Sequence, residues 1–98
     1  MTTDPREQHL KDLIGQINQV IRSKWPETLT EDSDPYGWAR ENAAELMAKR
    51  AKLSDEVDAL YLNGAPFDEF KKACKDWGRT ELEIFQLHAA ELRRKEAA

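Results

Sequence analysis

The stretch KDWGRTELE, from Lys75 to Glu83, decides between two folds for the C-terminal part of this chain. Gly78 follows a tryptophan, and Thr80 lies three residues ahead of Glu83, which is the spacing of a helix-capping box. These residues could form the turn of a helix-turn-helix, or Gly78 could be tolerated inside one long helix. The first alternative indicates DNA binding, and the second indicates a helical hairpin that binds protein.

The spacing of side chains on both sides of Gly78 favours the single helix. Steps of three and four residues continue without interruption across the glycine, and the preceding segment shows the same steps. Such steps are typical of the seam between two helices that pack side by side. The seam residues are Phe67, Phe70, Cys74, Trp77, Glu81, Ile84, His88 and Glu91 after the turn, and Ala39, Ala43, Leu46, Arg50, Leu53, Val57 and Leu60 before it.

The sequence NGAP at residues 63–66 separates these two segments. Gly64 can adopt the left-handed conformation that ends a helix, and Pro66 prevents the helix from continuing. Folding the chain back at this point places Leu53 opposite Trp77, and Arg50 opposite Glu81. These four residues form the predicted structural seam. A charged pair there adds little net stability but penalises slipped registers; alternatively, both side chains extend to water and do not meet.

Two Asp-Pro pairs, at Asp4 and Asp34, each predict a helix start, because aspartate caps a helix and proline suits its first position. We therefore expect helices over residues 5–24, 35–63 and 66–95 and a loop over 25–34; a bend at Gly78 is compatible with the last helix. No strand-like alternation is present. The sequence predicts an all-α fold in one domain (residues 1–98): a three-helix bundle with a long antiparallel hairpin and a shorter N-terminal helix.

The predicted helices differ in length. At about 1.5 Å per residue, the first spans roughly 30 Å and the other two span more than about 40 Å. We therefore expect the hairpin to project beyond the first helix at the Gly64 end. The projecting tip would be apolar and would require a partner. Trp38, one residue away from the seam, is a second candidate anchor. The candidate protein-binding residues are Tyr61, Leu62, Phe67, Phe70 and Trp38.

Composition limits the partners and the compartment. The 98 residues are 40% hydrophobic and 35% charged, with a formal net charge of -4, which argues against a general nucleic-acid binder. Basic residues recur at Lys71, Lys72, Lys75 and Arg79 among acidic neighbours. Such mixed charge is typical of a solvated helix surface, and the alternative is a local basic face for an acidic partner. A single cysteine excludes an internal disulfide, and no signal peptide or membrane segment is predicted, so we expect a cytoplasmic protein.

No catalytic, cofactor or metal site is predicted. His88 and Glu91 lie one turn apart, as metal ligands can, but no second histidine–carboxylate pair exists to complete a site. Cys74 has no catalytic companion and suits a small core position. We do not expect an enzyme.

The leading hypothesis is therefore a protein-interaction module, a small helical adaptor or inhibitor of a larger partner, which could also form a homodimer through the hairpin. In overall character the chain resembles many small bacterial, plasmid or phage proteins that act by binding. The alternative is a helix-turn-helix transcriptional regulator that binds DNA with residues 70–94. Carboxylates at Glu81, Glu83 and Glu91 would repel phosphate in that arrangement.

Overall fold

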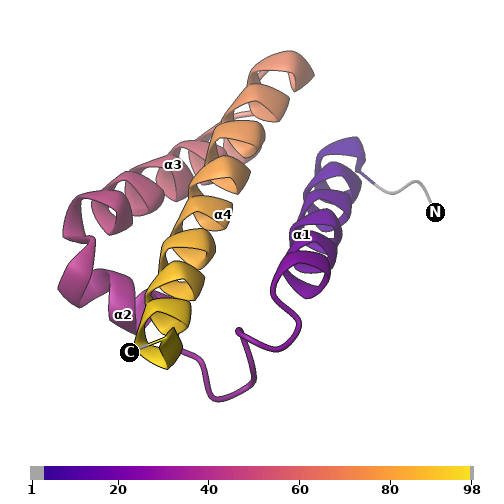
Figure 1. The fold of residues 1–98 in the computed structure, drawn as a ribbon. Coiled ribbons are helices and arrows are strands. Elements are labelled where there is room, and N and C mark those ends of the chain that lie inside the picture. Colours follow the sequence, from indigo (N-terminus) through magenta and orange to yellow (C-terminus); the bar gives the residue numbers. More distant parts are fainter. Residues whose placement is uncertain (1–3, 98) are drawn as a thin grey trace.

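The computed structural model describes residues 4–97 and contains four helices (Figure 1). They are α1 (Pro5–Lys24), α2 (Pro35–Asn42), α3 (Ala44–Leu62) and α4 (Phe67–Ala97). Every regular element within these residues is a helix, so this part of the chain has an all-α fold. Residues 1–3 and 98 of the predicted domain lie outside the described residues.

Both Asp-Pro pairs begin helices. The Asp4 carboxylate accepts a hydrogen bond from the backbone N–H of Arg6 at 2.9 Å, at the start of α1. The Asp34 carboxylate accepts one from the backbone N–H of Gly37 at 3.0 Å, at the start of α2. In the turn between α3 and α4, Gly64 adopts a φ of 64°, which favours glycine because it has no Cβ.

Gly78 lies inside α4, which runs through it as one helix. A Cβ atom at this position would lie 3.4 Å from Leu13 Cδ1 and 3.5 Å from Ile17 Cδ1, so Gly78 lies in the contact between α4 and α1. The alternative prediction of a helix-turn-helix over residues 70–94 is wrong in its geometry, because these residues form part of a single helix with no turn.

The predicted single helix over residues 35–63 is also wrong, because the chain breaks at Ala43. Ala43 has φ -142° and ψ 52°; its N–H ends α2 by donating to the Ala39 carbonyl at 2.7 Å, and its own carbonyl accepts the N–H of Leu46 at the start of α3. The Asn42 side chain donates to the Trp38 carbonyl at 2.9 Å, near the end of α2. The break redirects α2, so that its aromatic side chains meet α4.

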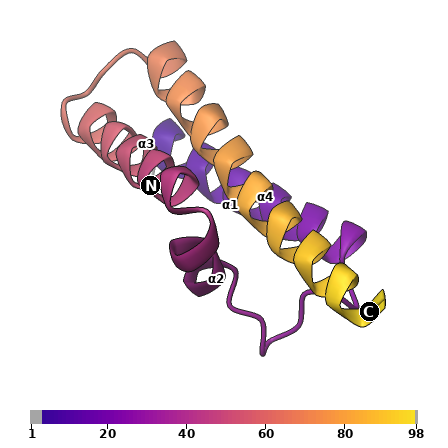
Figure 2. The same cartoon turned by 60° about the vertical axis from the view of Figure 1, so that its left-hand side comes forward.

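Helix α4 contacts each of the other three helices. Figure 1 shows α1 on one side of α4 and α2 and α3 on the other, and Figure 2 shows α3 and α4 side by side, joined by the turn at one end. A core lies where α1, α3 and α4 meet. Its buried residues are Val57, Phe70, Ala73 and Cys74, with Leu10, Leu13, Leu60 and Trp77 packed against them.

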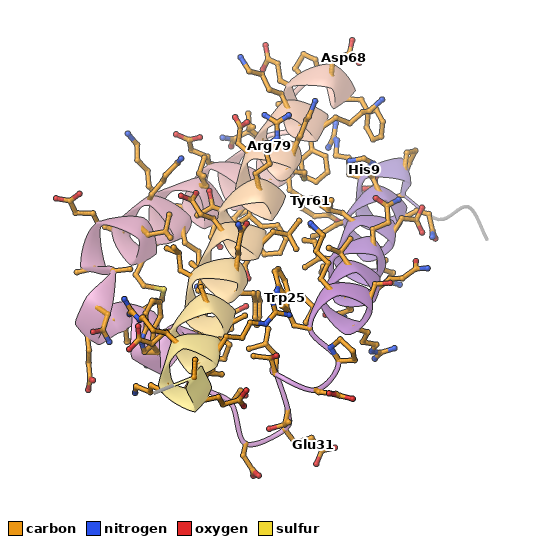
Figure 3. The ribbon with its side chains drawn as sticks, in the orientation of Figure 1. His9, Trp25, Glu31, Tyr61, Asp68 and Arg79 are labelled. Atoms are coloured by element: carbon orange, nitrogen blue, oxygen red, sulfur yellow. The ribbon has the colours of Figure 1, made fainter. Side chains whose placement is uncertain are left out.

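The start of α1 is tied to the α3–α4 turn, although Figures 1 and 2 show the start of α4 extending beyond α1. Arg6, in the first turn of α1, donates to the Ala65 carbonyl at 2.9 Å and to the Tyr61 carbonyl at 3.4 Å. His9 packs its ring edge against Phe67, with the ring centroids 5.8 Å apart. Figure 3 shows His9 at the end of α1 that lies nearest the Asp68 end of α4. The start of α1 is therefore anchored to the turn by side chains that reach it.

None of the helices within residues 4–97 combines the length and the apolar character needed to cross a membrane.

Candidate functional site

Three large apolar side chains remain exposed around the α3–α4 turn, and we call them the turn surface: Tyr61, Leu62 and Phe67. Leu62, the last residue of α3, is 81% exposed, whereas Tyr61 and Phe67 are each 37% exposed. Moving a leucine side chain out of water is favourable, so an almost fully exposed leucine at a turn that also exposes two aromatic rings is a candidate docking point.

The other two candidate protein-binding residues, Phe70 at the turn and Trp38 as the separate second anchor, are less exposed than a docking residue would be. Phe70 is fully buried, and its ring lies 6.1 Å from that of Tyr61 and 6.5 Å from that of Phe67, centroid to centroid. It therefore supports the turn surface from below and is not itself a docking residue. Trp38 is half-buried, because its ring packs 5.3 Å from that of His88 and holds α2 on α4.

A second surface, which the sequence did not predict as a site, is a groove between α1 and α4 with a volume of about 370 Å³. Its floor and walls combine apolar side chains with three cations on the α4 side. The residues that line it are His9, Leu13, Gln16, Ile17 and Val20 from α1, and Lys71, Lys75, Gly78, Arg79 and Leu82 from α4. The signal in the sequence was the four-residue spacing of Lys71, Lys75 and Arg79, which places them on one helical face.

The expected pairing of Arg50 with Glu81 is present in the seam. The Glu81 side chain is only 4% exposed, and its carboxylate accepts hydrogen bonds from Arg50 Nε and from the Tyr36 hydroxyl. The Arg50 guanidinium also stacks on the Tyr36 ring, 4.5 Å from its centroid. Tyr36 was not predicted as a member of this network. The other two predicted seam residues, Leu53 and Trp77, are half-buried.

The network joins α2, α3 and α4, and it contributes to a raised pKa of Tyr36. Burial, followed by the hydrogen bond to Glu81, raises the pKa of Tyr36 from 10.0 to about 12. The neutral hydroxyl therefore remains a hydrogen-bond donor at physiological pH. The three side chains satisfy one another's hydrogen-bonding groups inside the fold. The network therefore fixes how α2, α3 and α4 pack against one another.

His88 lies beside this network on α4 and is 7% exposed. Its Nδ1 atom is buried and has no hydrogen-bond partner among the described residues. Burial lowers the pKa of His88, and this effect is partly offset by the negative charge of Asp34. The neutral ring therefore suits this position, where it packs against Trp38.

Groups that could bind a metal do not cluster in the described part of the chain. Over residues 4–97, no three histidine, cysteine, aspartate or glutamate side chains come together as a possible ligand set. The Cys74 thiol is buried in the core, and this burial raises its pKa.

Comparisons of the chain with protein-family models, curated proteins and solved structures found no match. The turn surface and the groove between α1 and α4 are therefore the two candidate sites, and each is argued separately below from its own geometry.

Proposed function

We propose that this chain is a protein-interaction module, a small helical adaptor or inhibitor that binds a larger protein. In this proposal α3 and α4 act as an antiparallel hairpin within a three-helix bundle formed with α1. The hairpin presents the turn surface to the partner. The observation that carries the proposal is the 81% exposure of Leu62 at a turn where Tyr61 and Phe67 are also partly exposed.

The turn surface has the properties of an interface anchor. Transferring a leucine side chain from water to a partner contributes about 1.5–3 kcal/mol, and tyrosine is enriched among residues that dominate binding. The surface is also held in place from beneath, because Phe70 packs against both rings and Arg6 binds two carbonyls of the turn. A pre-ordered surface loses less conformational entropy on binding.

Substitution of Leu62 tests the proposal without disturbing the core. We expect Leu62→Asp to leave the thermal unfolding midpoint nearly unchanged, because the side chain is mostly in water, and to abolish capture of the partner that the wild-type chain retains from cells of its source. Phe67→Asp should act in the same direction. The matched control is Leu87→Asp, the same change at a leucine of α4 that is 42% exposed and distant in sequence from the turn.

The outcome that contradicts the proposal is equal capture of the same proteins by wild type, Leu62→Asp and Phe67→Asp. Light scattering on the purified protein distinguishes a second copy from a different partner. A dimer that Leu62→Asp converts to monomer identifies self-association through the turn surface, whereas a monomeric wild type indicates a different protein.

A further inference from the structure

The groove between α1 and α4 is lined almost entirely by apolar atoms, and the basic residues of its lining all lie on the α4 wall. Lys71, Lys75 and Arg79 line it at successive four-residue steps along α4, so their side chains follow one another at intervals of about 6 Å. The opposite wall, on α1, contributes the neutral amide of Gln16 and the ring of His9 as its polar groups. No aspartate or glutamate lines the groove.

Within residues 4–97 none of these three cations forms a close ion pair. Lys71 Nζ lies 5.3 Å from the centroid of the Phe67 ring. The carboxylates of α1 are engaged elsewhere, since Glu7 pairs with Lys11 at 3.2 Å and Asp12 accepts from the Gln8 amide at 2.9 Å. Asp76 and Glu83 of α4 lie one turn from Arg79 but do not line the groove, so the residues that line it carry only positive charge.

The floor of the groove is apolar. Leu13, Ile17 and Val20 reach it from α1, and Leu82 reaches it from α4. Gly78 lies between the two sets, and the absence of a side chain there leaves the floor open down to Leu13 and Ile17. The groove thus offers an apolar channel with a row of positive charges along one edge.

We propose that this groove binds an amphipathic α-helix of a partner protein, with the partner's apolar face on the floor and its acidic side chains against Lys71, Lys75 and Arg79. This inference rests on the proposed binding function, and it names the chemistry of the partner segment. Carboxylates spaced four residues apart on a helix recur at about 6 Å, which is the spacing of the three cations when the two helices lie alongside each other. The groove, from Lys71 to Leu82, accommodates about three turns of such a helix.

Other anionic ligands match only part of this surface. A fatty acid would fill the apolar floor but carries one carboxylate for three cations. A nucleic acid carries a row of phosphates, but it has no aliphatic side chains for the floor. The acidic amphipathic helix uses both features at once.

The test is a direct binding measurement with designed peptides and the whole chain. The probe is a fluorescein-labelled helical peptide of about 15 residues, with leucines at positions i, i+3, i+4 and i+7 on one face and glutamates four residues apart beside them. Anisotropy should show saturable binding that weakens as salt is raised. The Lys75→Glu/Arg79→Glu double variant should weaken it by at least about tenfold, because two attractive contacts become repulsive.

Lys72→Glu is the matched single control, because it makes the same change on the same helix at an exposed position that does not line the groove. It should alter the affinity less than about twofold. Circular dichroism on each variant confirms that the helices are retained. A peptide of the same composition with the leucines dispersed around the helix, and one with lysines in place of glutamates, should both fail to bind.

Three results would overturn the inference. The first is equal binding of the dispersed-leucine or lysine peptide, and the second is equal weakening by Lys72→Glu and by either single groove variant, Lys75→Glu or Arg79→Glu. The third is binding of palmitate, or of a second copy of the chain, at the groove with no binding of any acidic peptide. The Leu62→Asp capture experiment is independent of these results, so the groove inference can fail while the proposed function of the turn surface stands.

Discussion

Glu81 is a buried charged residue in a seam that is otherwise mostly apolar. Its carboxylate is buried and depends on two donors, Arg50 and Tyr36, from two other helices. The two partners of the ion pair are not equivalent, because the Arg50 side chain is 30% exposed whereas that of Glu81 is 4% exposed. Removing one partner therefore has different consequences depending on which one remains.

A double-mutant cycle tests this asymmetry. Arg50→Met should lower the free energy of unfolding by about 3 kcal/mol, because it leaves a buried carboxylate with the tyrosine alone. Glu81→Leu should cost less, about 1 kcal/mol, since the remaining guanidinium can reach water. The double variant should lie within about 1 kcal/mol of wild type, because an apolar pair avoids the desolvation of both charges. Urea denaturation measures all four proteins; additive single effects would show that the pair is not interdependent.

Helix α2 depends on its contacts with α4 for stability. It is only eight residues long, too short to be stable alone, and it is held on α4 by Tyr36 and Trp38. The Tyr36 ring packs 5.6 Å from that of Phe85, and the Trp38 ring packs 5.3 Å from that of His88. Protonation of His88 should therefore loosen α2.

We expect mild acid to destabilise the protein through His88. Burial lowers the pKa of His88 below its ordinary 6.5, so the unfolded chain binds the proton more tightly. The contribution of the neutral ring is complete above the unfolded pKa and is lost as the pH falls below 6.5 through the folded value. The free energy of unfolding should fall more steeply with decreasing pH in wild type than in His88→Gln, which lacks this proton site. Subtracting one slope from the other cancels the contributions of the other titrating groups. Parallel slopes below pH 6.5 would contradict the assignment of the acid effect to His88.

The elements show which features can be predicted from sequence. Asp4, Asp34 and Gly64 act through their own backbone neighbours, so helix starts and the turn could be read locally. The pairing of Arg50 with Glu81 followed from the steps along two regular helices. The break at Ala43 could not be read in this way, because alanine favours helix and Asn42 is a weak signal. Packing of the aromatic side chains of α2 against α4 determines it.

At the scale of the whole molecule, the position of α1 along α4 was not predictable. The helix lengths determine what length of the α3–α4 hairpin α1 can cover, but not which part of it. The sequence-based expectation left the turn uncovered. Contacts distant in sequence, from Arg6 to Ala65 and from His9 to Phe67, place the start of α1 at the turn. The groove forms where α1 lies against α4 around Gly78. The sequence of either helix alone therefore does not predict it. Trp25 is buried at the other end, in the space between α1 and α4 (Figure 3).

The limited burial of α1 should allow it to open before α4 does. Ile17 is its one buried residue, whereas α4 buries nine. Few buried contacts correspond to a low free energy of local opening, so native-state hydrogen exchange should show α1 amides exchanging through openings that leave the centre of α4 protected. Arg6→Ala, which removes two hydrogen bonds to the turn, should accelerate exchange in the first half of α1 and leave α4 unchanged.

The acidic peptide links this motion to binding, because a helix seated in the groove contacts α1 and α4 together. Peptide that saturates the wild type should therefore slow exchange across α1, and at the same concentration it should slow exchange less in Lys75→Glu/Arg79→Glu, which retains the helices but not the charged wall. Equal protection of α1 and α4 in the free protein would show that α1 opens only with global unfolding. In that case the groove would be a rigid, pre-formed site, and the peptide would slow the exchange of both helices to the same extent.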